Sequence, residues 1–302
     1  MTPGANVVAT RGRRRALLAD GPWLVGYVAF LAVFAIAPFL LVVVLSFTDA
    51  LLGDAAAHFV GLRNYRDLFE DPLFRGALVN TLAYTGLTVG GAVGLGLVCA
   101  LLLDTAGWAR PLYETVYFLP AMASSVAMLL VWEFMLHPDL GMVNQALQAA
   151  GWSPPAWLNG PDTALFTLSV IGVWQLFGLN VLLFVAALSA LPRSVFEAAA
   201  IDGVASPFDR TMRMTLPLLS PTIAFVSILT AVRSVQVFES VQVLTQGGPG
   251  NATNVILYQM YEEGFEFLEA GRASAVAVVF LLLTALAGIL RSVRLRGSAR
   301  WS

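Results

Sequence analysis

Six long stretches without charged residues divide the chain, and the polar and charged side chains gather between them. The stretches run from Gly21 to Thr48, Gly76 to Leu103, Thr115 to Trp132, Thr163 to Pro192, Met214 to Val232 and Ala273 to Leu290. An apolar helix needs about 20 residues to cross a hydrocarbon core of about 30 Å, and none of the stretches alternates as a lipid-facing barrel strand does. With their flanks they predict an all-α polytopic membrane protein with six transmembrane helices, over residues 21–48, 76–103, 115–135, 163–192, 214–238 and 272–290.

The composition supports this class of protein and excludes others. Of the 302 residues, 58% are hydrophobic and 12% are charged. The mean hydropathy of +0.77 excludes a soluble globular protein. A net charge of −2 gives no reason to expect nucleic acid as a partner. Because Cys99 is the single cysteine, the chain has no internal disulfide and no cysteine-based metal cluster.

The 17 basic residues are all arginine, and their distribution predicts which side of the membrane each segment faces. If the N-terminus is cytoplasmic, twelve arginines fall in cytoplasmic segments and four in external ones, as the positive-inside rule requires. We therefore expect a multi-pass protein of the cell (inner) membrane with two cytoplasmic tails, residues 1–20 and 291–302. The alternative for the first stretch is a secretory signal, but its apolar run is about twice the usual length and lacks a clear cleavage site.

The second stretch is rich in glycine. Gly86, Gly90 and Gly94 recur at four-residue spacing, with Gly91 and Gly96 beside them. Small residues on one face allow the backbones of membrane helices to approach closely. We expect this face to pack inside the subunit, and the alternative is a seam with another subunit.

The most structured sequence outside the spans is the loop over residues 193–217. Ser194 and Glu197 have the spacing of a capping box, which predicts that a helix starts there and continues through the alanines that follow. Gly203 stands where a helix would end in a left-handed residue, and Ser206, followed by proline, is a second start signal. The pattern predicts two short helices joined by a bend, on a surface that favours contact with another protein.

Several motifs resemble one family. The run from Glu197 to Gly203, followed by Leu216 and Pro217, is similar to the EAA loop of the membrane permease subunits of binding-protein-dependent ABC importers. With four further segments the resemblance covers nearly the whole chain, namely Phe59–Tyr65, Tyr117–Pro120, Pro138–Asn144 and Leu244–Asn251. Together they resemble the first permease of sugar and glycerol-3-phosphate importers. One departure is that Gly203 to Pro217 is one residue longer than the usual family spacing.

The resemblance implies the ABC type I importer permease fold and a division of labour among subunits. Two permeases would form a heterodimer around one path, two cytoplasmic ATP-binding cassette subunits would each receive one EAA loop, and an extracytoplasmic solute-binding protein would dock outside. The resemblance assigns the ATPase contact to Glu197, Ala198, Ala199, Asp202 and Gly203. A chain without lysine lacks the phosphate-gripping lysine of an ATP-binding loop. We therefore expect neither enzyme activity nor a cofactor in this chain, with ATP and Mg bound by the partner ATPase subunits.

The resemblance also places the solute path along the fourth and fifth spans. The candidates are Trp174 and Gln175 on the fourth span, and Thr230, Ser234 and Gln236 on the fifth. An aromatic face with a few amides and hydroxyls is what a polyol requires. The alternative is that the serine and threonine side chains bond back to their own helix and that Trp174 belongs to the core.

Arg233 is the one charged residue buried among the apolar segments, in the outer half of the predicted fifth helix. An arginine at depth costs about 2.5–3.5 kcal/mol, so it should face a cavity or a partner. A guanidinium suits a phosphate, which favours glycerol 3-phosphate or a glycerophosphodiester slightly over a neutral sugar. The alternatives are that Arg233 reaches the outer surface, or that it pairs with a carboxylate such as Glu239 or one on the second permease.

The expected function is half of the translocation path for a carbohydrate-type solute. The alternative is an ion-coupled secondary transporter, which normally has internal repeats and buried carboxylates, and neither is evident here. A membrane enzyme would need clustered catalytic groups. His58 and His137 are the only histidines, both in predicted external loops, and no metal-ligand spacing surrounds either.

Overall fold

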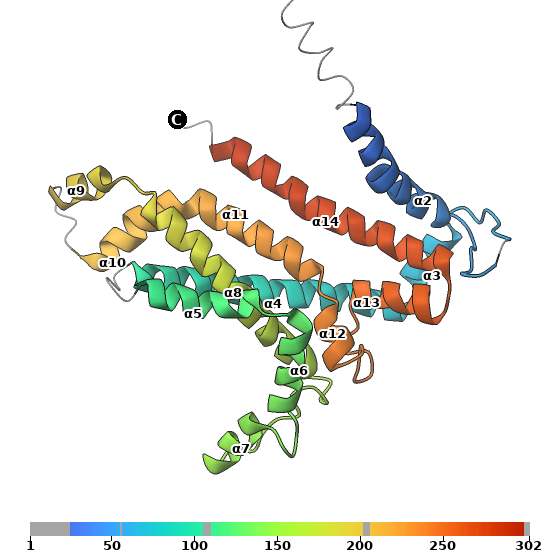
Figure 1. The fold of residues 1–302 in the computed structure, drawn as a ribbon, viewed down its shortest axis with the longest axis horizontal. Helices are drawn as coiled ribbons and strands as arrows, with labels where there is room; N and C mark the ends of the chain where they lie inside the picture. Colours follow the sequence, from blue (N-terminus) through green and yellow to red (C-terminus); the bar gives the residue numbers. More distant parts are fainter. Residues whose placement is uncertain (1–24, 55, 105–109, 202–205, 299–302) are drawn as a thin grey trace, which may run out of the picture.

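A computed structural model describes residues 25–54, 56–104, 110–201 and 206–298. These residues are mostly helical, and the one extended pairing among them is an isolated bridge between Thr48 and Phe59. Figure 1 shows four long helices running lengthwise through the molecule, α4 (Pro72–Leu103), α8 (Ala164–Ser189), α11 (Leu216–Val235) and α14 (Ala270–Ser298).

Four helices of the described chain are long and apolar enough to cross a membrane: Val25–Leu45, Pro72–Leu103, Ala164–Ser189 and Phe208–Val235. The first includes the π turn η1 (Ala32–Ile36) and α2 (Ala37–Leu45). The last joins α10 (Pro207–Arg210), the π turn η3 (Thr211–Thr215) and α11. The apolar part of α14, Ala270–Ala285, is shorter.

The third charge-free stretch, expected as one helix, is two helices in the structure. α5 (Arg110–Met122) and α6 (Ser125–Met135) meet at 86°, and they count as a fifth span if the bent pair crosses the membrane. Pro120 lies in the last turn of α5, where it has no backbone N–H to donate. Ser124 then adopts an extended backbone, with φ −60° and ψ 124°, and the chain turns before α6 begins.

Two other predicted ends differ from the structure. The fifth helix, expected over residues 214–238, begins at Pro207 as α10 and ends at Val235. The sixth, expected to end at residue 290, continues as α14 to Ser298, so the predicted tail from 291 is helical for most of its length.

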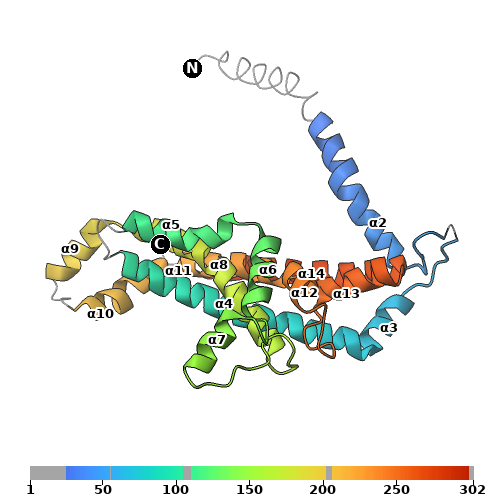
Figure 2. The ribbon, with the colours of Figure 1, turned by 60° about the horizontal axis from the view of Figure 1, so that its bottom comes forward.

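Shorter helices lie between the long ones. They are α3 (Arg63–Glu70), α7 (Met142–Ala149), α9 (Arg193–Ile201), α12 (Glu239–Leu244), α13 (Ile256–Tyr261) and the π turn η4 (Glu262–Glu266). Figure 1 shows α6 and α7 projecting away from the long helices, and Figure 2 shows α2 extending away from the rest of the molecule.

The core lies where α4, α8 and α11 pack together, around Val93, Ala100, Val181, Phe184 and Val226. α5 also packs on α8, and the two backbones approach so closely that position 178 admits only glycine. A Cβ on Gly178 would lie 1.9 Å from the carbonyl oxygen of Tyr117 on α5.

The glycine face of α4 packs differently from our expectation. Gly91 and Gly96 do pack against α8, where a Cβ would lie 2.5 Å from Val173 and 2.9 Å from Asn180. The four-residue series itself, Gly86, Gly90 and Gly94, has no atom of the described chain within 4 Å of an added Cβ beyond its own helix. The series therefore points away from the subunit core.

Candidate functional site

A cavity of about 550 Å³ opens where α11 ends, between α4, α8, α6 and α12. Its polar lining comprises a phenol, three hydroxyls, two amides, a guanidinium and a carboxylate, from Tyr84, Ser125, Ser234, Ser240, Gln175, Gln236, Arg233 and Glu239. Leu129, Leu176, Val237 and Phe238 supply the apolar walls. Such a mixture of apolar wall and convergent polar groups is typical of a site for a small polar molecule.

The end of α11 explains why polar side chains gather here. The helix ends at Val235, Gln236 leaves helical geometry with φ −83° and ψ 17°, and the backbone N–H of Val237 donates to the carbonyl oxygen of Ser234 at 3.2 Å. The chain then enters α12 at Glu239. Within eight residues, 233–240, the chain therefore brings a cation, an anion and three neutral polar groups to one cavity.

One buried hydroxyl of this site, that of Ser234, has unused hydrogen-bonding capacity. Ser234 is 1% exposed, yet its Oγ has no hydrogen-bond partner in the structure. Buried polar atoms are nearly always paired. A solute hydroxyl in the cavity could supply the missing partner.

Four of the six residues expected on the solute path line this cavity: Gln175, Arg233, Ser234 and Gln236. Thr230 does not. It is buried, with its hydroxyl 2.8 Å from the carbonyl oxygen of Val226 and 3.1 Å from Asn180 Oδ1, so it bonds back to its own helix and to α8.

Trp174 also lies off the cavity lining. Its ring is half-buried and packs edge-on against Trp132, with 5.5 Å between the ring centroids. Sequence reasoning missed Tyr84 and Ser125, because they lie on α4 and α6 and no spacing links them to α8 or α11. It also missed Ser240, and it considered Glu239 only as a partner of Arg233.

Arg233 is exposed rather than buried, and it faces the cavity. Within the part of the chain that the structure describes, its guanidinium lies within 4 Å of no carboxylate, including that of Glu239. The cation is therefore available to a solute or to another subunit.

The predicted ATPase contact lies partly on α9, at one end of the long helices (Figure 1). Glu197 and Ala198 are exposed, and Ala199 is buried. The helix begins at Arg193, so Ser194 lies in its first turn and not at the cap as expected. Asp202 and Gly203, with the predicted bend, lie outside the described residues.

The second start signal gives the expected helix. α10 begins at Pro207, and the backbone N–H of Arg210 donates to the carbonyl oxygen of Ser206 at 3.0 Å. The guanidinium of Arg210 lies 4.5 Å from the centre of the Phe196 ring, in a cation–π contact that links α9 to α10. Exposed Ile201 and Phe208 leave apolar surface beside this contact.

The helix from α10 to α11 is continuous because the π turn η3 joins them. A π turn bonds residue i to i+5 and so holds one residue more than an α turn. The segment from Gly203 to Pro217 is one residue longer than the usual spacing, and η3 lies inside it. The π turn therefore accommodates one residue more in this segment than an α turn would. One helix connects the end near α9 to the cavity at Arg233, Ser234 and Gln236.

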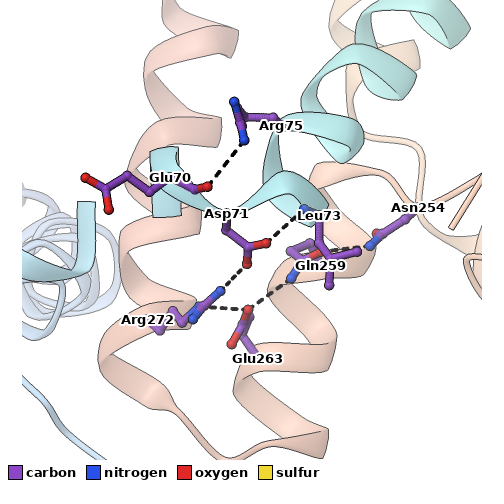
Figure 3. Close-up of polar contacts among 8 residues, drawn as sticks. All are labelled: Glu70, Asp71, Leu73, Arg75, Asn254, Gln259, Glu263 and Arg272. Carbon is purple, nitrogen blue, oxygen red and sulfur yellow. Dashed lines mark hydrogen bonds and ion pairs between the residues drawn. The ribbon is translucent and has the colours of Figure 1, made fainter. Parts of the chain in front are cut away.

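A second polar cluster, shown in Figure 3, ties α14 to the start of α4. Arg272 donates through Nη2 to Asp71 Oδ2, and its Nε lies 2.9 Å from Glu263 Oε1. Gln259 Nε2 donates to the same carboxylate at 2.9 Å. Asp71 also caps α4 by accepting from the backbone N–H of Leu73 at 2.8 Å.

Glu263, in η4, is almost fully enclosed by this cluster, with 4% of its side chain exposed. Burial raises its pKa, while the hydrogen bond from Gln259 and the charge of Arg272 oppose that rise. No spacing in the sequence signals this cluster.

The fold is that of the membrane subunit of an ABC transporter. The chain is similar in structure to the bacterial alginate ABC transporter solved with an alginate pentasaccharide-bound periplasmic protein. The TM-score is 0.79 at 21% identity, covering 92% of this chain and 94% of that chain. A more distant likeness, with a TM-score of 0.54 at 19% identity over 74% of this chain and 95% of the other, is to the MetNI methionine ABC transporter.

The particular family follows from the sequence match. Residues 92–294 match the binding-protein-dependent transport system inner membrane component, and the chain belongs to that family. It is 34% identical to the sn-glycerol-3-phosphate transport system permease protein UgpA of Pectobacterium atrosepticum, over 76% of this chain and 77% of that protein. It is 30% identical to the arabinooligosaccharides transport system permease protein AraP of Bacillus subtilis, over 90% and 86%. The expected family, a permease subunit of binding-protein-dependent importers, is confirmed.

Proposed function

We propose that this permease carries a carbohydrate-type solute, a sugar or a glycerol phosphate, through the cavity at the end of α11. The observation that carries this proposal is the lining itself, with amides, hydroxyls and an unpaired cation around an apolar wall. The named relatives, which serve sn-glycerol 3-phosphate and arabinooligosaccharides, support the same class of solute. In this proposal Gln175, Ser234 and Gln236 hydrogen-bond to solute hydroxyls, and Arg233 contacts the most electron-rich group.

The proposed topology has six membrane spans and both termini in the cytoplasm. The four long apolar helices, the bent pair α5 and α6, and α14 account for the six. α9 and the C-terminal end of α14 lie toward the same end of the long helices (Figure 1). This supports a C-terminus on the same side of the membrane as the loop over residues 193–217.

The proposed assembly is a heterodimer with a second permease, two ATP-binding cassette subunits that bind ATP and Mg, and an external solute-binding protein. The helix Val25–Leu45 has no buried residue in its most apolar window, and Gly86, Gly90 and Gly94 face no other part of the described chain. Both surfaces support a partner in the membrane. The exposed Glu197 and Ala198 on α9, with Asp202 and Gly203, would form the contact with one ATPase subunit.

The test is transport by the complex reconstituted in proteoliposomes with its ATPase subunits and solute-binding protein. We expect a sugar or glycerol 3-phosphate to raise ATPase activity and to be imported. Arg233→Gln should selectively impair uptake if the solute carries a phosphate, because a guanidinium grips a phosphate with two hydrogen bonds. Thr230→Val is the matched control, since Thr230 lies off the cavity. Import of neither class of solute would overturn the proposal.

A further inference from the structure

A second cavity, of about 550 Å³, lies between the end of α6, α7 and the loop around residues 154–159. It shares no lining residue with the cavity at the end of α11. One wall is apolar, formed by Leu136, Trp157, Leu158 and Leu244. The lining also includes His137 and the buried Asn144, together with two carboxylates and two amides, here called the polar wall, from Glu133, Asp139, Gln148 and Asn159.

The apolar wall is held rigidly. The indole N–H of Trp157 donates to Asn144 Oδ1 at 2.7 Å. Asn144, which is 3% exposed, donates from Nδ2 to the carbonyl oxygens of His137 at 3.0 Å and Pro138 at 3.3 Å. Trp157 also packs against the buried cluster that contains Leu129 and Leu136. The indole is therefore positioned before any ligand arrives, which reduces the entropy lost on binding.

The polar wall, in contrast, is not used by the fold. Within the described chain, the side chains of Glu133, Asp139, Gln148 and Asn159 make no hydrogen bond or ion pair. All four are exposed in the cavity. Their acceptors and donors are free for a ligand.

The chemistry of the lining selects the ligand. An aromatic ring in the same cavity as amides and carboxylates fits a sugar ring, which presents apolar C–H groups to an indole and hydroxyls to polar side chains. The cavity has no arginine in its lining, and its two carboxylates repel a phosphate. It differs in this respect from the cavity that Arg233 lines.

The two cavities are adjacent along α6. Ser125 and Leu129 line the first, and Glu133, four residues further on the same helix face, lines the second. Ser125 and Glu133 are separated by about 12 Å at 1.5 Å per residue. α12 packs on α6 and contributes Ser240 to one cavity and Leu244 to the other.

From these observations we infer that the cavity beside α7 is a second solute-binding site, which takes a neutral glycosyl unit next to the site at the end of α11. The inference rests on the proposed function and narrows its substrate class to solutes that include an uncharged sugar ring.

The experiment measures protection of a single thiol in the assembled complex in detergent. Cys99 is the only cysteine of the chain, so Cys99→Ser removes the competing thiol from this chain, and labelling is read on this chain after the subunits are separated. Gln148→Cys places a thiol in the cavity, and Gln145→Cys places a matched thiol on the same helix outside it. The probes are maltotriose, arabinotriose and trehalose as neutral sugars, and glycerol 3-phosphate as the charged comparison.

We expect at least one neutral sugar to slow labelling at Gln148→Cys, to about one third of its rate at twice the dissociation constant. The rate at Gln145→Cys should stay constant, and glycerol 3-phosphate should have no effect at either position. Glu133→Gln combined with Asp139→Asn should weaken protection by the sugar while leaving the yield of complex unchanged.

Three results would overturn the inference. The first is no protection of the Gln148→Cys thiol by any sugar up to about 50 mM, a concentration far above the millimolar dissociation constants of weak sites. The others are equal protection at Gln148→Cys and Gln145→Cys, and protection by glycerol 3-phosphate as strong as by the sugar. Labelling requires no ATP hydrolysis and is scored separately from transport. If the complex imports a carbohydrate but Gln148→Cys is unprotected, only this inference fails. If protection occurs and no carbohydrate is imported, only the proposed function fails.

Discussion

Arg272 is the residue on which the packing of α14 against the start of α4 depends most directly. It is the one cation in the cluster that contains Asp71 and Glu263, and Figure 3 shows its guanidinium between the two carboxylates. The variant Arg272→Met keeps an unbranched apolar stem in place of the aliphatic part of arginine but removes both ion pairs. The carboxylate of Glu263 then remains enclosed with only Gln259 as a hydrogen-bond donor.

The magnitude follows from the burial of the two carboxylates. Removing one partner of a buried ion pair costs about 3–5 kcal/mol, because the other charge stays buried and unpaired. The side chain of Glu263 is 4% exposed, but those of Asp71 and Arg272 are 17% and 28% exposed. Partial access to water places the expected loss at the lower end, about 3 kcal/mol. For a chain of a few hundred residues, this corresponds to a fall in Tm of about 6–12 °C.

The loss should depend on pH. Burial raises the pKa of Glu263 above its ordinary value, so its contribution to stability is fully present below the unfolded pKa and declines as pH rises through the folded pKa. Arg272 holds that pKa down, so Arg272→Met raises it further. The deficit of the variant relative to the wild type should therefore be largest at alkaline pH and shrink as the pH falls through the raised pKa of Glu263, where this side chain takes up a proton in the folded state.

The assay is thermal unfolding of the purified complex, followed by the loss of the intact peak in size-exclusion chromatography. Arg75→Met is the matched control, because Arg75 is exposed and makes only one long contact, 3.4 Å, to the carbonyl oxygen of Glu70. It should cost no more than about 0.5 kcal/mol. Adding Glu263→Gln to Arg272→Met should restore most of the loss. Equal stability of Arg272→Met and Arg75→Met, or a deficit that grows on acidification, would refute the reasoning.

Two further predictions concern the helix that joins α9 to the cavity. Deleting Met212 should convert the π turn to an α turn, and uptake and copurification of the ATPase subunit should stay near wild type. Deleting Ile228 from α11 rotates the rest of the helix by about 100° and should abolish uptake. A larger loss of uptake from the Met212 deletion than from the Ile228 deletion would contradict the assignment of η3. Arg210→Ala should lower solute-stimulated ATPase activity two- to fivefold, since an exposed cation–π contact contributes about 0.5–1 kcal/mol. The exposed Arg213, paired with Asp209, is the control, and an equal effect of Arg213→Ala would count against a specific role for Arg210.

Local sequence was sufficient for helices and for parts of two sites. In a membrane every backbone N–H and C=O group must be hydrogen-bonded within the protein, so a long charge-free stretch forms a helix. α4 and α8 cover the second and fourth stretches for this reason. Start signals act through neighbouring backbone groups, and so Ser206 and Pro207 mark the beginning of α10. Gln175 and Ser234 could be predicted as cavity residues from the resemblance to the permease family together with their polar side chains.

Tertiary structure decided what depends on contacts between distant segments. Asp71 and Arg272 are 201 positions apart, and no periodicity relates them; only the packing of α14 beside α4 brings their charges together. Tertiary structure also decides the places of Glu239 and Thr230. Glu239 lines the cavity because α11 ends at Val235, and Thr230 lies off the cavity with its hydroxyl bonded to Asn180 on α8. Residue type alone determines which hydrogen bonds and ion pairs a side chain can form. Which side chains come into contact depends on how the helices pack, and helix packing depends on the volumes of all the side chains in the core.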